Sequence, residues 1–320
     1  MESEHRDSVM TALTPGAVAH SHSMTAVPRP PGSIAVILNP AAQSMRASRR
    51  LQSVRTLTAV ARLAETQAAG DARRMARELA EGGWTTIVAA GGDGTMNEVV
   101  SGLMEAKVEV LPELGLLPMG TMNVFALELG LPVLDLAACW QRVTDGRTRE
   151  VDAWRAGSHV FVQMAGVGID AQVIRQTTWQ AKKQWGPLSY LGTLSRLLDS
   201  PPAELRLRVD GGPWLTGTSA LMGNGRLYGG PFPVFPDAGN DDGCLDVALI
   251  HGHGPSTFSN LVADVLLRGI DENHGGVTRQ RGWQITIEAA DPQPFEIDGE
   301  IGGETPLVVT PHEKRLRVVV

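Results

Sequence analysis

The sequence predicts an α/β domain with a parallel sheet, followed by a β-rich domain. In residues 33–149, short apolar runs alternate with segments of helical composition, which is typical of parallel strands covered by helices. From residue 150 onward, short apolar or alternating runs are separated by clusters of Gly, Pro and Asp, which indicates strands joined by turns. A chain of 320 residues is also long enough to bury two separate cores.

The first domain is expected to consist of repeated strand and helix units. The expected strands are the apolar runs at residues 34–38, 85–90 and 114–118. The expected helical segments are 71–80 and 122–129, and an Ala, Arg and Leu-rich stretch at 46–63 precedes the first of them. Strands and helices that alternate at these lengths predict a parallel sheet with helices packed over it.

The second domain, residues 150–320, is expected to be a β-rich sandwich. Its expected strands are 160–164, 204–209, 244–250, 283–288 and 315–320, and its expected helices are 188–198 and 257–267. The final strand is assigned either to this domain or to the sheet of the first domain. Residues 1–32 lack the apolar core of a signal peptide and show no periodicity, so we expect a disordered leader, or translation from Met24.

Composition excludes several classes of protein. The formal net charge of -7 argues against nucleic-acid binding, because such proteins normally carry a basic face. No apolar run reaches the ~18 residues that can span a bilayer. Two cysteines, Cys139 and Cys244, are too few for a disulfide framework and fit a reducing cytoplasmic location. A homodimer is also compatible with this composition.

A glycine-rich turn follows the second expected strand. Gly91, Gly92 and Gly94 lie where this strand passes into a helix, together with Asp93, Thr95 and Asn97. Glycines let the backbone approach a ligand, and a helix start favours anions, so this segment predicts a phosphate cradle. A tight turn with glycines for geometry alone is about as common for an isolated Gly-Gly pair. Asp93 favours the cradle, because a carboxylate near phosphates implies an intervening Mg²⁺.

A similar loop follows the next expected strand, where Gly120, Thr121 and Asn123 stand at a helix start. Ligands of open parallel sheets bind beyond the carboxyl ends of the strands, so both loops can face one nucleotide. Thr121 and Asn123 could bond its phosphate or ribose oxygens, and Thr121 is also expected to cap the helix. The P-loop and dinucleotide-binding glycine patterns are absent.

The two loops together resemble the diacylglycerol kinase catalytic domain, shared by bacterial lipid kinases, sphingosine kinases and ceramide kinases. The resemblance implies the fold of the NAD kinase and diacylglycerol kinase superfamily, with ATP as co-substrate. Asn39, which precedes Pro40, resembles the opening nucleotide-side turn of that family, and Thr66 matches a threonine that contacts ATP. The likeness extends over nearly all of residues 33–320.

The resemblance also implies a structural Mg²⁺ in the turn at residues 236–246. By that likeness the ligands are the Asp242 carboxylate and the carbonyls of Gly239 and Cys244. Clustered carboxylates and glycines make an oxygen-rich turn that suits a hard cation. A plain solvated turn explains the same residues about as well.

Two carboxylates flank a glycine after an expected strand near the end of the chain. The resemblance implies that Asp298 is the general base and Glu300 its partner, although either could hold the role. A lipid hydroxyl that attacks the γ-phosphorus must lose its proton, so such a group is needed. Without the other motifs, a hairpin turn built on Asp-Gly is the simpler explanation.

Two departures from the family pattern bear on activity. Residues 41–43 are Ala, Ala and Gln where the family usually has glycine, and Val124 stands where it often has Asp. An NAD kinase-like enzyme shares the first loop, but its downstream Ser-Thr-Pro-x-Gly-Ser segment is missing here. A weakly active lipid-binding protein is the other alternative, supported only by Gln43 and Val124.

The expected acceptor is a lipid at a membrane surface. Residues 179–190 hold two Trp, one Tyr and two Lys, which suit the headgroup region of an anionic membrane, or a helix packed against the second domain. Residues 223–236 could line the acceptor pocket. Diacylglycerol leads by the breadth of the family, with sphingoid and other lipids as alternatives, and peripheral membrane contact is expected.

Overall fold

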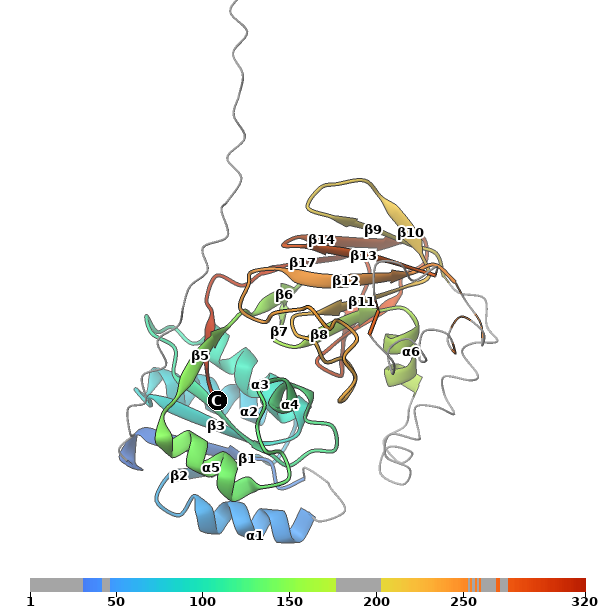
Figure 1. The fold of residues 1–320 in the computed structure, drawn as a ribbon. Coiled ribbons are helices and arrows are strands. Elements are labelled where there is room, and N and C mark those ends of the chain that lie inside the picture. Colours follow the sequence, from blue (N-terminus) through green and yellow to red (C-terminus); the bar gives the residue numbers. More distant parts are fainter. Residues whose placement is uncertain are drawn as a thin grey trace, which may run out of the picture.

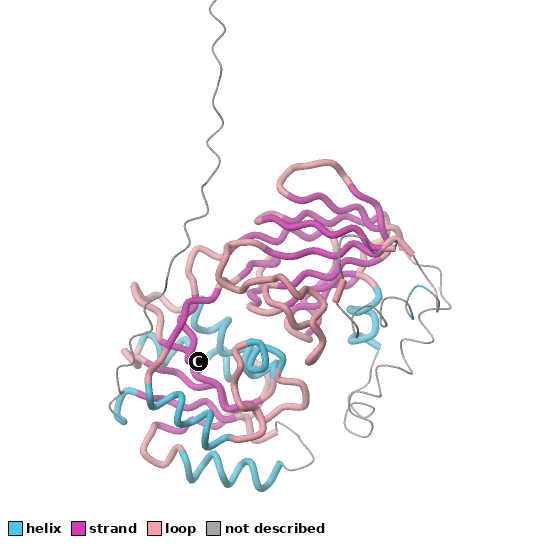
Figure 2. Tube along the Cα trace, in the orientation of Figure 1, coloured by secondary structure: helices cyan, strands magenta, loops and turns pink. Residues whose placement is uncertain are grey.

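The computed structural model describes residues 31–41, 47–176, 203–252, 254, 257, 259, 269–270 and 276–320. These residues form an α/β domain and a β-rich domain, which meet along one side of each (Figures 1 and 2). The expected leader up to residue 30 lies outside the described residues. So do the expected helix at 188–198 and all but residues 257 and 259 of the one at 257–267.

The first domain holds one six-stranded sheet in the order β2-β1-β3-β4-β18-β5. Its strands are β1 (Ile34–Leu38), β2 (Arg62–Glu65), β3 (Thr86–Gly91), β4 (Glu113–Pro118), β5 (Thr148–Val151) and β18 (Leu316–Val319). Its helices are η1 (Pro31–Ser33), α1 (Ala47–Leu57), α2 (Asp71–Glu81), α3 (Asp93–Glu105), α4 (Val124–Glu128) and α5 (Leu136–Asp145). Strands β2, β1, β3, β4 and β18 are parallel, whereas β5 runs antiparallel to β18.

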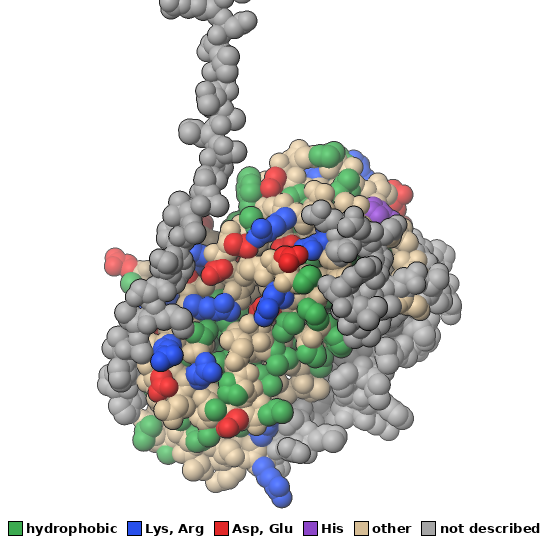
Figure 3. Space-filling model, in the orientation of Figure 1, with side chains coloured by type: hydrophobic (Ala, Val, Ile, Leu, Met, Phe, Trp, Pro, Cys, Tyr) green, Lys and Arg blue, Asp and Glu red, His purple; other side chains and the backbone are tan. Residues whose placement is uncertain are grey.

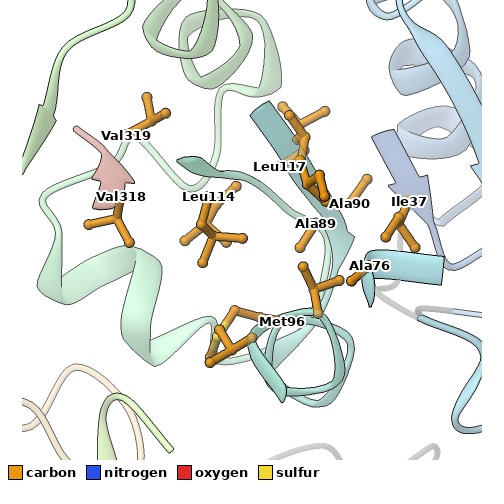
Figure 4. Close-up of a cluster of buried hydrophobic side chains, with 14 of the residues drawn as sticks. Ile37, Ala76, Ala89, Ala90, Met96, Leu114, Leu117, Val318 and Val319 are labelled. Atoms are coloured by element: carbon orange, nitrogen blue, oxygen red, sulfur yellow. The ribbon is translucent and has the colours of Figure 1, made fainter. Parts of the chain in front are cut away.

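Helices cover both faces of this sheet, so its central strands are buried on both sides (Figure 1). That double burial is why β1 and β3 appear in the sequence as continuous apolar runs. Figure 4 shows Ile37, Ala89 and Leu114 of three strands in one cluster with Met96 of α3. Val318, near the end of the chain, belongs to the same core.

The second domain is a sandwich of two antiparallel sheets, in the orders β10-β9-β14-β17-β6-β7 and β13-β12-β11-β8-β15-β16. Its elements up to β11 are β6 (Trp154–Ala156), β7 (His159–Phe161), β8 (Met164–Val167), α6 (Ile169–Gln176), β9 (Leu205–Val209), β10 (Leu215–Gly217) and β11 (Ser219–Gly223). The later strands are β12 (Leu245–Ile250), β13 (Val277–Gly282), β14 (Ile285–Ala289), β15 (Pro294–Ile297), β16 (Glu300–Glu304) and β17 (Leu307–Pro311). Inward-facing side chains of both sheets, such as Ile285 and Met222, share one core.

Three features differ from the expected elements. The Ala, Arg and Leu-rich stretch at 46–63 contains α1, which ends at Leu57, and the start of β2, a strand that was not expected. The strand expected at 160–164 is split into β7 and β8, which belong to different sheets. The last strand, β18, joins the sheet of the first domain, so the chain crosses between the domains both after β5 and after β17.

Candidate active site

The first glycine-rich loop joins β3 to α3, with Gly92 in extended conformation just before the helix. A Cβ atom on Gly91 would collide with the side chain of Thr95, and one on Gly92 would lie 3.2 Å from Cα of Gly120. The loop therefore needs bare backbone to pack against the second loop. Its N–H groups lie at the start of a 13-residue helix, where the helix dipole favours an anion.

The second loop is closed by Asn123, which adopts the left-handed conformation with φ 50° and ψ 50°. Its Oδ1 accepts a hydrogen bond from the N–H of Gly120, and its Nδ2 donates to the carbonyl of Gly120, both at 2.9 Å. The side chain thus folds its own turn. The helix begins at Val124 and not at residue 122, and the exposed Thr121 makes no cap to it.

Asp93 ties the two loops together. Its Oδ2 accepts from the N–H of Asn123 and its Oδ1 from the N–H of Val124, each at 2.8 Å. Burial raises the pKa of this carboxyl, and the hydrogen bonds from backbone N–H groups oppose that rise. These are the contacts of a helix cap; the cation contact expected for Asp93 stays a prediction.

Two further predicted residues lie at the same edge of the sheet, beyond the carboxyl ends of β1 and β2. Asn39 donates from Nδ2 to Oγ1 of Thr95 at 2.9 Å, so the turn after β1 is attached to the phosphate loop. Thr66 is buried, and its N–H donates to the carbonyl of Leu38 at 2.9 Å. A small pocket opens between the loops, lined among others by Gly92, Asp93 and Asn123.

Asp298 occupies the turn between β15 and β16, where its φ of 45° is left-handed. Its carboxylate accepts four hydrogen bonds, from Nδ2 of Asn97 at 3.0 Å and from the N–H groups of Val162, Gln163 and Met164 at 3.0–3.1 Å. The residue is 3% exposed. Burial raises the pKa of Asp298 to about 6, against the effect of these hydrogen bonds. Both oxygens accept hydrogen bonds in this structure, and the role of Asp298 as general base stays a prediction.

Asn97 was expected at the nucleotide, but its side chain faces the second domain. Nδ2 donates to Oδ2 of Asp298 and to the carbonyl of Val160, each at 3.0 Å. Asn97 lies one turn along α3 from Asp93, on the side of the helix that contacts β7. The residue therefore joins the phosphate-loop helix to the turn at Asp298.

Glu300, at the start of β16, reaches back to the phosphate loop. Its side chain is exposed, and a Cβ atom on Gly94 would collide with its Oε1. Glu300 thus brings an accessible carboxylate from the second domain to the helix start that forms the predicted phosphate cradle. Asp298 and Glu300 flank Gly299, but the structure gives them different surroundings.

Known proteins share this architecture and its motifs. The sequence profile of the diacylglycerol kinase catalytic domain matches residues 33–156, and that of the YegS C-terminal NAD kinase beta sandwich-like domain matches residues 163–320. A probable lipid kinase YegS-like protein of Pseudomonas fluorescens is 34% identical over 243 residues, which cover 75% of this chain and 79% of that protein.

A diacylglycerol kinase of Bacillus subtilis is 31% identical over 250 residues, with the same coverage of 75% and 79%. A crystal structure from Bacillus anthracis, assigned provisionally as a diacylglycerol kinase, superposes with a TM-score of 0.76 at 25% identity, over 90% of this chain and 94% of that one. The chain belongs to the diacylglycerol kinase catalytic domain family. It is a lipid kinase, and membership of this family implies ATP as the phosphate donor.

In this lipid kinase an arginine pairs with the carboxylate of the turn that is expected to hold a structural Mg²⁺. The Asp242 carboxylate contacts the guanidinium of Arg281, and its Oδ1 accepts from the N–H of Cys244 at 2.9 Å. Nearby, Asp152 pairs with Arg315 at 2.8 Å. Among the described residues, no group of three or more Asp, Glu, His or Cys could hold a metal ion. The predicted ligand set, which is the Asp242 carboxylate and the carbonyls of Gly239 and Cys244, stays a prediction, and Arg281 offsets the charge of its one carboxylate.

Other predicted features of the lipid kinase fall outside the described residues, namely Gln43 and the segment 179–190. Within the part of the chain that is described, no helix combines the length and the apolarity needed to cross a bilayer.

Sequence reasoning missed a carboxylate that links α4 to the loop after β11. Glu128 accepts from the N–H of Leu227 at 2.7 Å and from Nε2 of Gln163 at 3.2 Å, and its side chain is only 6% exposed. A glutamate in an otherwise apolar helix was the available signal, since buried carboxylates need partners.

Proposed function

We propose that this lipid kinase transfers the γ-phosphate of MgATP to the hydroxyl of diacylglycerol, giving phosphatidic acid. The phosphates would bind at the two loops, where the N-terminus of α3 and the bare backbone of Gly92 and Gly120 favour an anion. The match to a diacylglycerol kinase of Bacillus subtilis supports this acceptor over a sphingoid base. Sphingoid and other lipids remain the alternative acceptors.

We assign proton transfer to Glu300. In the reaction, the acceptor oxygen forms a bond to the γ-phosphorus, the bond from that phosphorus to the β-phosphate oxygen breaks, and the hydroxyl proton passes to a carboxylate. The contact of Glu300 with Gly94 is the observation that carries this assignment. Asp298, whose oxygens accept four hydrogen bonds, would instead fix the turn that presents Glu300.

The acyl chains of the acceptor would lie along the apolar surface between the domains. Figure 3 shows hydrophobic side chains gathered there on one face of the molecule, with basic and acidic side chains intermixed above them. Phe232, in the loop after β11, is 39% exposed. A lipid that is partly extracted from a bilayer fits such a surface, so the proposal includes peripheral membrane contact from the cytoplasmic side.

Transfer of labelled γ-phosphate in mixed micelles tests the proposal. The panel contains diacylglycerol, a sphingoid base, ceramide, phosphatidylglycerol and, as a soluble acceptor, NAD. Labelling of diacylglycerol above the other acceptors supports the proposal. Preferred labelling of another lipid would replace the acceptor, and labelling of NAD alone or of nothing would overturn lipid phosphorylation.

Substitutions separate the two carboxylates. Glu300→Gln should lower kcat by about 10²- to 10⁴-fold with the fold intact, because it removes the general base. Asp298→Asn should instead lower the free energy of unfolding by about 1–3 kcal/mol, since an amide nitrogen would face N–H donors. Glu304→Gln is the matched control, because Glu304 lies on the same strand and pairs with Arg175 at the surface. Equal kcat for Glu300→Gln and the control would show that Glu300 is not the general base.

A further inference from the structure

Three acidic side chains from separate segments meet beneath the turn that carries Glu300. Asp170 lies on α6, Tyr228 in the loop after β11 and Glu296 on β15. The Tyr228 hydroxyl contacts Oδ2 of Asp170 and Oε1 of Glu296, the latter at 2.8 Å. Glu296 is fully buried, and a Cβ atom on Gly166 would collide with both Asp170 and Tyr228. The backbone of β8 therefore seals the cluster.

The hydrogen-bond count in this cluster requires a proton on a carboxyl. A phenol has one proton and can donate it to only one of the two carboxyl groups that it contacts. The other contact needs an O–H donor, which only a protonated Asp170 or Glu296 can supply. Consistent with this count, burial raises the pKa of both carboxyls and of Tyr228, and repulsion by Asp170 raises the pKa of Glu296 further.

No basic side chain of the surrounding described elements is directed at the cluster. On α6, Arg175 pairs with Glu304 of β16 at the surface, and in the loop after β11, Arg226 pairs with Glu128. Strands β8 and β11 contain no titratable side chain. On the turn itself, Asp298 adds a further negative charge that acts on Glu296. Within the described residues, a shared proton is thus the available source of neutralisation.

The cluster is attached directly to the turn. Oε2 of Glu296 accepts a hydrogen bond from the N–H of Gly299 at 2.8 Å, and Gly299 stands between Asp298 and Glu300 with a φ of 88°. From the other side, the backbone of β8 and its preceding residues hold Asp298. The position of Glu300 against Gly94 therefore depends on both attachments.

We infer that Asp170, Tyr228 and Glu296 form a proton-sharing cluster that positions Glu300 at the phosphate loop. The cluster acts through Gly299 and touches neither nucleotide nor acceptor, so its members are positioning residues. Loss of the shared proton would leave two carboxylates around one phenol, and their repulsion would displace the turn. The inference deepens the proposed function and rests on the role given there to Glu300.

The shared proton can be tested without any enzymatic assay, because the chain contains only two tyrosines. In the full-length Tyr190→Phe variant labelled with ¹³Cζ-tyrosine, a single resonance reports on Tyr228. We expect it to shift with a midpoint above the ordinary carboxyl range, while the phenol itself stays neutral. Glu296→Gln in the same background should abolish that step, since an amide supplies the missing donor. A resonance that does not move between pH 5 and 9, or a step that persists in Glu296→Gln, overturns the inference.

Kinetics then test positioning. Tyr228→Phe should lower kcat on the lipid acceptor by up to about 10²-fold with little change in the KM for MgATP, as expected for a misplaced general base. Glu296→Gln should retain at least tenfold more kcat than Glu296→Ala, because it still accepts from Gly299. Glu304→Gln is the control for a lost surface carboxylate. Equal losses in the Gln and Ala variants would overturn positioning by this cluster.

The two claims fail differently. If the unaltered protein labels no acceptor, the proposed function fails, yet the Tyr228 resonance still decides whether the proton is shared. If transfer occurs and the Tyr228 resonance shows no step, the cluster fails and the proposed function stands.

Discussion

The N–H of Val124 donates a 2.8 Å hydrogen bond to Oδ1 of Asp93. Val124 departs from the Asp that the resemblance to the family leads one to expect at this position, and the weakly active alternative rests partly on this departure. The hydrogen bond shows that the backbone of residue 124, whatever its side chain, anchors α4 to the phosphate loop. Asp93 is therefore as much part of the scaffold of the two loops as a candidate for contact with MgATP.

Asp93→Asn is expected to destabilise the protein and weaken MgATP binding. An amide offers one acceptor to two N–H donors, and its NH₂ group would face one of them, at a cost of about 1–3 kcal/mol. Urea unfolding and calorimetric titration with MgATP measure the two effects. Asp135→Asn is the control, because Asp135 caps α5 through one oxygen and Asn caps about as well. Unchanged stability in Asp93→Asn would contradict the cap.

Gly94→Ala is expected to abolish most activity without loss of stability. The new methyl group would displace Glu300, and a shift of about 1 Å in a catalytic group can cost about 10²-fold in kcat. Because Gly94 lies inside α3, alanine should keep or raise helix stability, by up to about 1 kcal/mol. Gly32→Ala, which meets open space, is the control in phosphate-transfer and melting assays. A fully active Gly94→Ala variant would show that the contact between Glu300 and Gly94 is not needed for the reaction.

Much of the first domain was predictable because its central strands are buried on both faces. The runs at 34–38, 85–90 and 114–118 match β1, β3 and β4 to within one residue. Strand β2 was missed since it is four residues long and half exposed at the sheet edge, so its sequence carries no apolar run. The return of β18 to the first sheet could not be decided either, because the sequence of a strand does not determine which strands it pairs with.

The candidate site divides in the same way. Local spacing predicted both glycine loops and the turn that carries Asp298 and Glu300, since the geometry of a turn depends on neighbouring residues. What those carboxylates contact was not predictable, because the hydrogen bond from Asn97 to Asp298 joins residues 201 apart in sequence. Tyr228 and Glu296 likewise come from different segments, and no motif connects them.

Removal of divalent cations is expected to leave the stability of the free protein unchanged. Arg281 neutralises Asp242 and lies 3.5 Å from Asp246, so the turn needs no metal to offset its charge. Melting with EDTA or with Mg²⁺ should give the same Tm. Arg281→Gln should lower stability by up to about 1 kcal/mol and make Tm rise with Mg²⁺, because the carboxylates are then unpaired. Arg175→Gln, which breaks another surface pair, should show no such response. A Tm that falls with EDTA in the unaltered protein would contradict this prediction and support the structural metal.

The buried carboxyls are expected to make stability fall as pH rises from about 4 to about 6. Burial raises the folded-state pKa of Asp298 from 3.8 to about 6, and it raises those of Asp170 and Glu296 as well. In this window the folded chain binds protons that the unfolded chain has released, so their stabilising contribution is complete below about pH 4. For Asp298 alone, a rise of about two units corresponds to roughly 3 kcal/mol.

Urea unfolding between pH 4 and 8 measures this dependence. The slope of the unfolding free energy against pH is compared with that of a variant that lacks one of the buried carboxyls. Glu296→Gln should flatten the decline, because it deletes a carboxyl whose proton is held in the folded state. Glu304→Gln, an exposed carboxyl on the neighbouring strand, should leave the slope as it is. If Glu296→Gln steepened the decline, Glu296 would have to be ionised in the folded protein. The carboxyl that donates a hydrogen bond to the phenol oxygen would then be Asp170.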